Sequence, residues 1–253
     1  MYRGLTVGAV APARDEERSI GPVVRDLLAL TDAAGGRLID EFVVCDNGST
    51  DGTAFRAQEA GARVVRQDRP GYGIACLTAL AALAPADVVL FTDGDGSFVA
   101  GQAESLLAEV AGGADLVIGS RVHGRAEAGA LSLPQVAGNR VAALLIRVLW
   151  GQRISDLGPY RAIRTVSLRR IAMEDRAYGW TVEMQIKAIQ HGLKVVEIPV
   201  DTRRRRYGRS KVGGTIRGVA GASAGILGKI ARLWVEQKSQ ALRTGRRKEV
   251  DRS

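Results

Sequence analysis

The sequence predicts an α/β fold in which a mostly parallel sheet is flanked by helices. Short apolar or β-branched runs alternate with stretches of helical periodicity through the first 120 residues, at the spacing of βαβ units. The run 88–91 is apolar without interruption, which is typical of a strand that helices cover on both faces. The chain of 253 residues is long enough for one large domain with an appendage.

The expected elements can be placed in order along the chain. Strands are expected at residues 5–10, 41–46, 63–66, 87–93, 115–119 and 195–200. Helices are expected at residues 18–31, 51–60, 72–83, 99–111, 136–150 and 182–191. We therefore divide the chain into a globular domain over residues 1–211, an amphipathic helix over 212–240 and a disordered basic tail over 241–253.

Polar or charged residues follow four consecutive predicted strands. These clusters are residues 12–17, 46–49, 93–95 and 119–121. The carboxyl ends of parallel strands meet at one edge of a sheet, and the ligands of such sheets bind beyond that edge. The clusters therefore predict an active site at this edge.

Asp93 and Asp95 directly follow the apolar run 88–92. On an extended segment, residues two apart point to the same side, so both carboxylates can face one cation. Such oxygen ligands suit Mg²⁺ or Mn²⁺, which often complete their coordination with substrate phosphates. Asp-Gly is also common in turns, so the metal interpretation depends on the strand that precedes the pair.

The formal charge of +9 is concentrated at the C-terminus. Residues 1–202 carry 21 Lys and Arg against 24 Asp and Glu, whereas residues 203–253 carry 15 against 3. This distribution indicates that the C-terminal segment contacts an anionic surface or substrate. It does not favour a nucleic-acid-binding protein, because no aromatic stacking platform or recognition motif accompanies the charge.

Apolar side chains recur at helical spacing near the C-terminus, at Ile216, Val219, Ile226, Ile230, Leu233 and Trp234. Arg217, Lys229 and Arg232 interrupt this face, which argues against a membrane-spanning helix. The face can lie on an anionic membrane surface or pack on the domain. Amphipathicity alone does not distinguish the two.

Two features bear on the cellular compartment. Cys45 and Cys76 lie in or beside apolar runs without disulfide or metal-site spacing, so we expect free thiols in a reducing compartment. The first residues have the pattern of a strand, not of a signal peptide. We therefore expect a cytoplasmic protein, held peripherally at the inner face of the cell membrane by its basic C-terminus.

Four motifs resemble the family 2 glycosyltransferases of GT-A fold, and they lie at residues 12–17, 44–53, 71–73 and 93–95. Their order and spacing agree with that family across roughly the first 120 residues, so the resemblance implies a GT-A fold for the domain over 1–211. Further motifs resemble the branch that contains the dolichyl- or polyprenyl-phosphate sugar synthases. These motifs lie at residues 119–121, 155–161, 178–185 and 208–211.

The resemblance implies an inverting enzyme that transfers a hexose from a UDP- or GDP-sugar to a polyprenyl phosphate, with Mg²⁺ or Mn²⁺ as cofactor. An alternative keeps this chemistry but uses a soluble acceptor, either a phosphorylated small molecule or a glycan. A nucleotidyltransferase is disfavoured, because a Gly-rich loop with a lysine is missing near the first strand and Arg14 is the only basic residue there.

The resemblance also implies individual roles at the donor. The nucleotide sugar would contact Pro12, Ala13, Asp15, Glu17, Asp46, Gly71, Gly73 and Asp93. Asp46 would accept a hydrogen bond from the base, and the two glycines would let the backbone approach the nucleotide, unless they only form a helix-initiating turn. Asp95 would be the main metal ligand, and Asp93 would share the ion, which offsets the charge of the leaving diphosphate.

Basic residues would contact the acceptor phosphate or the diphosphate, and the candidates are Arg121, Arg140, Arg206, Ser210 and Lys211. Arg121 follows the fifth strand, where the resembling enzymes bind the acceptor phosphate, and a bidentate guanidinium suits phosphate geometry. The alternative for Arg140 is a solvated charge on a helix. The remaining arginines, 203–205, are expected to face anionic lipid or solvent.

The acceptor decides whether a general base is needed. A phosphate acceptor is already ionised, whereas a hydroxyl acceptor requires a carboxylate base. Glu183 and Asp156 are the two candidates, and the apolar helix around Glu183 would raise its pKa. The alternative for Glu183 is a buried carboxylate that hydrogen-bonds a neighbouring loop.

Overall fold

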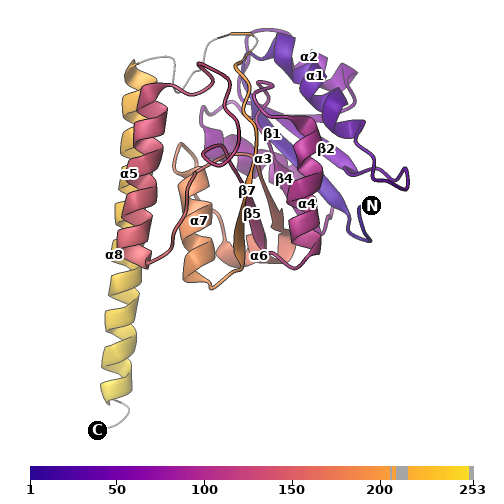
Figure 1. Ribbon diagram of the computed structural model, residues 1–253. Helices are drawn as coiled ribbons and strands as arrows, with labels where there is room; N and C mark the ends of the chain where they lie inside the picture. Colours follow the sequence, from indigo (N-terminus) through magenta and orange to yellow (C-terminus); the bar gives the residue numbers. More distant parts are fainter. Residues whose placement is uncertain (206, 209–215, 251–253) are drawn as a thin grey trace.

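The structure, a computed structural model, describes residues 1–205, 207–208 and 216–250. Within these residues, a seven-stranded sheet has the strand order β3-β2-β1-β4-β6-β5-β7 (Figure 1). The strands are β1 (Val7–Ala13), β2 (Glu41–Asp46), β3 (Arg63–Arg66), β4 (Val88–Phe91), β5 (Leu116–Ser120), β6 (Arg161–Arg164) and β7 (Val195–Pro199).

The helices are α1 (Glu17–Leu28), α2 (Thr53–Glu59), α3 (Tyr72–Ala82), α4 (Ala103–Ala111), α5 (Leu133–Trp150), α6 (Thr165–Ile171), α7 (Trp180–Gln190) and α8 (Ile216–Val250). A short 3₁₀ turn, η1 (Ala100–Gln102), precedes α4. All six predicted strands and the six helices predicted before residue 200 are present, with ends that differ by at most four residues. The α/β prediction is therefore confirmed.

Strand β1 lies where the strand order of the sheet reverses. This strand pairs in parallel with β2 on one side and with β4 on the other, so that Ala13 lies opposite Asp46 and Val10 opposite Phe91. Chain order thus reverses between β1 and β4, and ligands of open α/β sheets bind beyond the carboxyl ends of the strands at such a switch point. The segments that follow these two strands carry residues 14–17 and 92–97.

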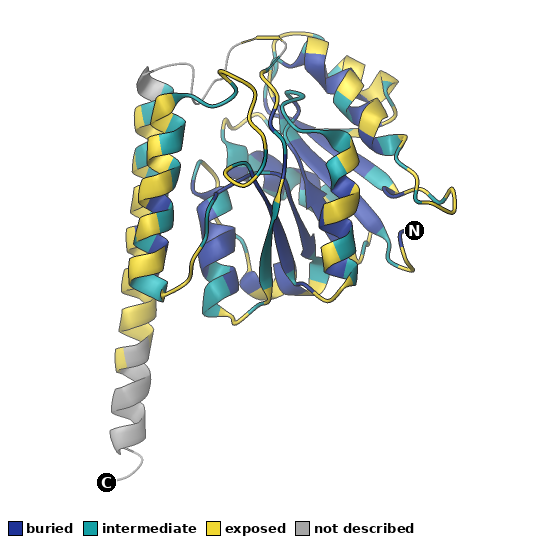
Figure 2. Ribbon diagram, in the orientation of Figure 1, coloured by how far each residue is buried: buried dark blue, intermediate teal, exposed yellow. Residues whose placement is uncertain are grey.

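Helices cover both faces of the sheet, which is buried between them (Figure 2). On one face, α1, α2 and α4 pack on alternate strand residues such as Val44 and Leu90. On the other face, α3, α6 and α7 pack on the intervening residues such as Val43 and Phe91. Because successive side chains of a strand point to opposite faces, the continuous apolar runs supply both layers.

The antiparallel strand β6 was not predicted. It lies between β4 and β5, and pairs antiparallel with both. Its pattern is hidden because an arginine occupies each end. Arg161 is fully buried and donates hydrogen bonds to the carbonyl oxygens of Leu157, Gly158 and Thr181. Main-chain acceptors satisfy the guanidinium, and burial lowers the pKa of Arg161 to about 10.

The C-terminal helix packs on the domain. Ile230 and Leu233 of α8 are 2% and 5% exposed and form an apolar cluster with α5 and α7 (Figure 1). Its described part runs from Ile216 to Val250 and so includes residues 241–250 of the segment that was expected to be disordered, whereas residues 212–215 lie outside the described residues. Residues 251–253 lie outside the described residues.

Among the described residues, no helix combines the length and the apolarity that crossing a bilayer requires.

Candidate active site

A cavity of about 990 Å³ opens at the switch point, beyond the carboxyl ends of β1 and β4. Its walls come from the segments after β1, β2, β4 and β5, from the start of α3, and from residues 129–135 and 202–205. The structure brings seven predicted site residues to this cavity: Pro12, Ala13, Asp15, Gly71, Asp93, Asp95 and Arg121. The predicted convergence of the strand ends therefore agrees with the structure.

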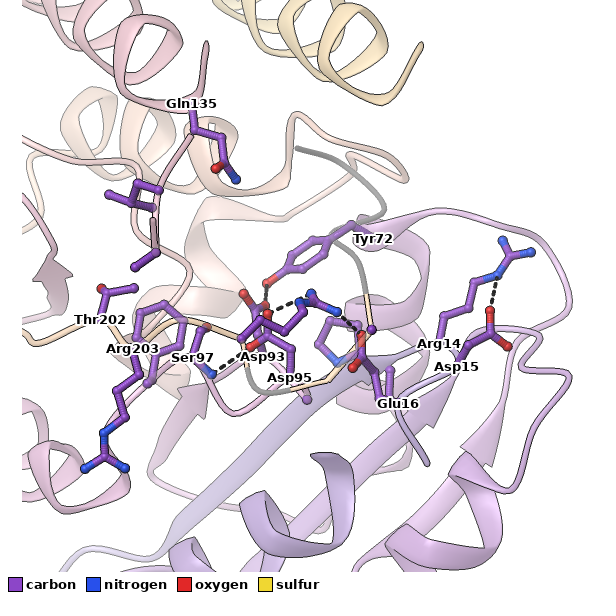
Figure 3. Close-up of a pocket in the computed structure, with 18 of the residues that line it drawn as sticks. Arg14, Asp15, Glu16, Tyr72, Asp93, Asp95, Ser97, Gln135, Thr202 and Arg203 are labelled. Carbon is purple, nitrogen blue, oxygen red and sulfur yellow. Dashed lines mark hydrogen bonds and ion pairs between the residues drawn. The ribbon is translucent and has the colours of Figure 1, made fainter. Parts of the chain in front are cut away.

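The two carboxylates after β4 have different surroundings (Figure 3). Asp93 Oδ1 accepts a hydrogen bond of 3.0 Å from the Tyr72 hydroxyl, and Asp95 Oδ1 accepts one of 2.9 Å from the Ser97 backbone N–H. Burial, followed by the neighbouring charge of Asp95, raises the pKa of Asp93 to about 7. This pair therefore concentrates negative charge at a partly buried point of the cavity wall, where a cation would be favoured.

Arg205 joins the segments after β1 and β4. Its Nη1 lies 2.6 Å from Glu16 Oε1, and its Nη2 lies 2.7 Å from Asp95 Oδ2. Arg205 was expected to face lipid or solvent, and instead it lines the cavity. Glu16 also lines the cavity, whereas the predicted Glu17 lies outside it, with its carboxylate 3.9 Å from Arg56.

Asp15 and Asn47 connect the ends of β1 and β2. Asp15 has a φ of 47°, and its Oδ1 accepts a 2.8 Å hydrogen bond from the Thr50 N–H. Asn47 lines the cavity and its carboxamide binds the backbone of Gln67, Arg69 and Gly71.

Asp46, which was predicted to contact the base of the nucleotide, does not line the cavity. This carboxylate is buried, accepts a hydrogen bond from the Ser49 N–H and lies 3.9 Å from Arg66. Its neighbour Asn47 takes the position that was expected for Asp46 at the wall of the cavity.

Glycine is required at both positions at the start of α3, because another loop of the protein lies close to them. A Cβ at Gly71 would collide with the carbonyl oxygen of Arg176, and one at Gly73 would collide with that of Asp175. The closely approaching backbone is thus the loop 174–178, and Gly73 itself does not line the cavity. Gly73 N–H donates to Ala177 O at 3.1 Å, so this loop and α3 are directly joined.

Glu183 fixes the same loop from the other side. Its Oε2 accepts hydrogen bonds from the backbone N–H groups of Glu174 and Asp175, at 3.1 and 2.7 Å. Its Oε1 lies 3.2 Å from Lys187 and 3.4 Å from Lys229. The side chain is 1% exposed and lies outside the cavity lining, so the alternative of a buried, loop-binding carboxylate agrees with the structure.

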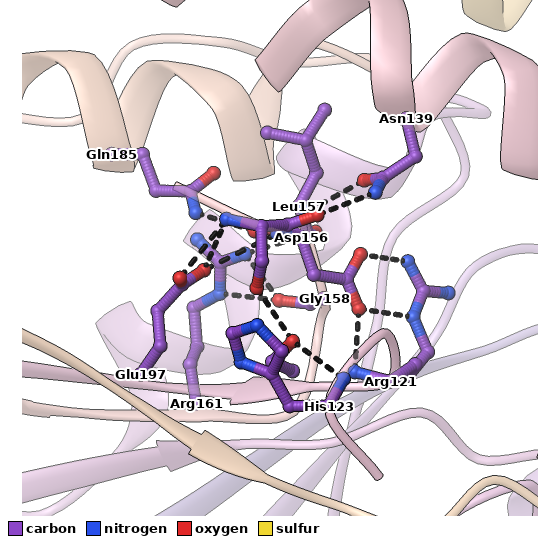
Figure 4. Close-up of polar contacts among 11 residues, drawn as sticks. Arg121, His123, Asn139, Asp156, Leu157, Gly158, Arg161, Gln185 and Glu197 are labelled. Carbon is purple, nitrogen blue, oxygen red and sulfur yellow. Dashed lines mark hydrogen bonds and ion pairs between the residues drawn. The ribbon is translucent and has the colours of Figure 1, made fainter. Parts of the chain in front are cut away.

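Arg121 and Asp156 form a buried pair beside the cavity (Figure 4). Arg121 Nε donates to Oδ2 at 2.8 Å, Nη2 donates to Oδ1 at 2.7 Å, and the backbone N–H donates to Oδ2 at 2.8 Å. Burial alone would raise the pKa of Asp156, but the hydrogen bonds and charge of Arg121 outweigh it, and the pKa falls below its ordinary value. Asp156 is therefore an ionised partner of Arg121, not a base.

The loop that carries Asp156 is itself fixed. Glu197 accepts hydrogen bonds from the N–H groups of Ser155 and Asp156, and Gln185 donates to the Asp156 carbonyl oxygen at 2.7 Å (Figure 4). Asn139 of α5 donates to the Ser155 carbonyl and accepts from the Leu157 N–H. The guanidinium of Arg121 is consequently held at the wall of the cavity in one orientation.

Of the other four predicted acceptor residues, only Arg140 lies among the described residues. Arg140 is exposed on α5 and lies outside the cavity lining, in agreement with a solvated helix charge. Arg206, Ser210 and Lys211 fall outside the described residues.

The cavity also contains residues that the sequence did not single out. Tyr72 lies inside the Gly71–Gly73 motif, so its position next to two glycines was an available signal. Thr202 is 3% exposed, and its hydroxyl has no hydrogen-bond partner among the described residues. It lies directly before the arginine run, but no spacing marks it as a site residue.

The donor set fits a divalent cation that substrate oxygens help to bind. Among the described residues, no group of three or more His, Cys, Asp and Glu side chains could hold a metal by itself. Asp95 is 13% exposed to the cavity and already has a cationic guanidinium on one oxygen. Mg²⁺ and Mn²⁺ suit a site with one or two carboxylates and substrate phosphates.

Comparisons with known proteins agree with this geometry. The family model described as glycosyl transferase family 2 matches residues 9–171. An uncharacterized glycosyltransferase of Mycobacterium tuberculosis is 38% identical over 218 residues, which cover 85% of this chain and 93% of that protein. A dolichyl-phosphate hexose transferase of Haloferax volcanii is 33% identical over 195 residues, which cover 76% of this chain and 80% of that protein.

A solved structure extends the likeness to the fold. The crystal structure of glucosyl-3-phosphoglycerate synthase from Mycobacterium tuberculosis in complex with Mn²⁺ and UDP-glucose has a TM-score of 0.69 and 26% identity. The match covers 90% of this chain and 80% of that chain.

Proposed function

Because the chain belongs to glycosyl transferase family 2 and has the predicted GT-A fold, we propose that it transfers a hexose from a UDP-sugar to a phosphorylated acceptor. The observation that carries the proposal is the meeting of Asp93, Asp95, Glu16 and Arg121 around one cavity. The Mn²⁺ and UDP-glucose of the related crystal structure favour UDP over GDP.

We place the nucleotide against the ends of β1 and β2, where Pro12, Ala13 and Asn47 line the cavity. Asp95, assisted by Asp93, would hold Mg²⁺ or Mn²⁺. When bound, the cation offsets the charge that develops on the departing UDP. The partly buried position of Asp93 strengthens electrostatic interactions at this point, because water screens them less than at an exposed site.

We place the acceptor phosphate at Arg121. Asp156 fixes the guanidinium through two side-chain hydrogen bonds, so its charge is oriented before the acceptor arrives. The cavity of about 990 Å³ has room for a sugar nucleotide and a small acceptor. A small, soluble phosphorylated acceptor is the preferred reading, because the related solved structure belongs to a glucosyl-3-phosphoglycerate synthase.

A polyprenyl phosphate acceptor is the second candidate. It is supported by the dolichyl-phosphate hexose transferase among the relatives and by the two candidate bases, Asp156 and Glu183, which are both committed to other contacts. An ionised phosphate oxygen needs no base and would attack opposite to UDP, with inversion. Such an acceptor would place the enzyme at the inner face of the cell membrane.

Turnover assays with the two acceptor classes test the proposal. The protein would be incubated with UDP-glucose and Mn²⁺, and with either 3-phosphoglycerate or a short polyprenyl phosphate in detergent. We expect a glycosylated phosphoglycerate and free UDP. A lipid-linked product alone would transfer the assignment to the second candidate. If neither acceptor raises the rate of UDP release above the rate without protein, both candidates are contradicted.

A further inference from the structure

Arg205 contacts Glu16 and also Asp95, the carboxylate that would hold the divalent cation. We propose that Arg205 is an exchangeable counter-ion, which leaves Asp95 when a divalent cation binds and then pairs with the diphosphate of the nucleotide. This inference rests on the proposed function, since it concerns the same metal and nucleotide. It assigns the arginine a positioning role at the donor.

The first argument is the geometry of the bridge. Each terminal nitrogen of the guanidinium contacts a different carboxylate, Glu16 at 2.6 Å and Asp95 at 2.7 Å. The three side chains are only 22%, 8% and 13% exposed. Charge-assisted hydrogen bonds at these distances are strong, and they offset the repulsion between carboxylates that would otherwise face each other across the switch point.

The second argument is competition for Asp95. Both of its oxygens already accept a hydrogen bond, Oδ1 from the Ser97 N–H and Oδ2 from Arg205. The Ser97 donor belongs to the backbone of the same loop, so it cannot leave without refolding that loop. A divalent cation and a guanidinium on one carboxylate oxygen would also repel each other. The arginine side chain is therefore the group that has to move.

The third argument is the arrangement of the neighbouring backbone. The Arg203 N–H donates to Ser97 O at 2.8 Å, and the Arg204 N–H donates to Glu127 Oε2 at 2.8 Å. These contacts hold the backbone of the segment against the metal loop while the long side chain of Arg205 can change rotamer. A released guanidinium would stay next to the diphosphate, whose geometry suits bidentate arginine.

The exchange has a thermodynamic consequence. Mn²⁺ alone must displace Arg205 without giving it a new partner, whereas Mn²⁺ with UDP supplies a diphosphate in exchange. Binding of the metal and binding of UDP should therefore favour each other, and part of this coupling should depend on Arg205.

Mn²⁺ binding measured by electron paramagnetic resonance, with and without UDP, tests the exchange. The variant is Arg205→Gln, and the matched control is Arg204→Gln. The control also removes one positive charge from this segment, but it removes no described contact with Asp95 or Glu16. We expect Arg205→Gln to bind Mn²⁺ alone about tenfold more tightly than wild type, and UDP at saturating Mn²⁺ about tenfold more weakly. We expect Arg204→Gln to change Mn²⁺ binding alone by no more than about threefold.

A second measurement guards against misfolding of the variant. Without metal, Arg205→Gln should melt at a lower temperature than wild type, because Asp95 and Glu16 lose their contacts with the guanidinium, and Mn²⁺ should raise its melting temperature more than that of wild type. Arg205→Lys, which keeps the charge but cannot contact both carboxylates with one planar group, should bind Mn²⁺ with intermediate affinity.

The outcomes separate this inference from the proposed function. If wild type turns over UDP-glucose with Mn²⁺ but Arg205→Gln binds Mn²⁺ as wild type does, the exchange is refuted and the function stands. Equal effects of the two glutamine variants also refute it, since general charge would explain them. If wild type binds no Mn²⁺ even with UDP, the metal-dependent function and the exchange both fall.

Discussion

Two arginine–carboxylate contacts face the same cavity, but their surroundings differ. Asp156, the partner of Arg121, is 1% exposed on a loop that Glu197 and Gln185 fix through its backbone. Arg205 instead connects two segments through side chains alone, Glu16 after β1 and Asp95 after β4. The chemistry of the pairs is similar. The contacts around each pair decide whether it belongs to the framework or can exchange with a ligand.

The largest effect is expected at the exchangeable contact, which joins Arg205 to Asp95. Asp95→Asn should lower kcat/KM for the UDP-sugar about 10³-fold, because a neutral carboxamide loses the charge that holds the cation. Initial rates at saturating Mn²⁺ measure this loss. Asp68→Asn is the matched control, since this carboxylate is 80% exposed and lies outside the cavity lining. A rate for Asp95→Asn within tenfold of wild type would contradict the metal role.

The framework pair should instead show its effect in stability. Asp156→Asn should lower the free energy of unfolding by about 3 kcal/mol, because it removes the buried carboxylate that pairs with Arg121, which is itself only 17% exposed. Urea unfolding measures the loss. Glu236→Gln removes an exposed partner of Arg232 and should cost no more than about 0.5 kcal/mol. Equal losses in the two variants would remove the distinction between buried framework and exposed surface.

A third variant tests whether the rigid framework extends to the C-terminal helix. Ile230→Ala should lower the free energy of unfolding by about 2 kcal/mol, because the side chain is 2% exposed between α5 and α7. Leu242→Ala, at a position that is 72% exposed, should change it by less than about 0.5 kcal/mol. If both variants unfold like wild type, α8 is not part of the folded domain.

The smallest expected effect is a pH dependence of the framework pair. The folded-state pKa of Asp156 is depressed, so this carboxylate contributes stability above its unfolded pKa of about 4. The contribution is lost as the pH falls through the folded pKa. The difference in unfolding free energy between wild type and Asp156→Asn should therefore be constant above about pH 5 and shrink below it. A difference that grows on acidification would give the pKa shift the opposite sign.

The sequence predicted what depends on local pattern. The parallel strands have apolar runs, and their polar ends meet because of the topology, so Asp93, Asp95 and Arg121 could be placed at one edge in advance. The strand β6 was missed because its two arginines disguise a buried segment, and only the carbonyl acceptors around Arg161 make that burial possible.

Contacts between distant residues were not predictable from the pattern. Arg205 is 189 residues from Glu16 and 110 residues from Asp95, and an arginine in a basic run gives no local signal of which carboxylate it meets. The same holds for Glu183, whose partners include Lys229 of the last helix. The glycines of α3 were predicted to let the backbone approach the nucleotide, but the backbone that they accommodate is the distant loop 174–178.

The contacts of α8 set a practical limit for anyone who shortens this protein for crystallography or expression. Lys229 lies 3.0 Å from Asp175 and 3.4 Å from Glu183, and Gln237 accepts a hydrogen bond from Trp150. Trimming back to Gln237 removes the end of the helix and keeps these contacts. Trimming past Lys229 removes one contact of the loop against which Gly71 rests and takes Ile230 and Leu233 out of the apolar cluster, so such a protein should be less stable and bind its sugar donor less well.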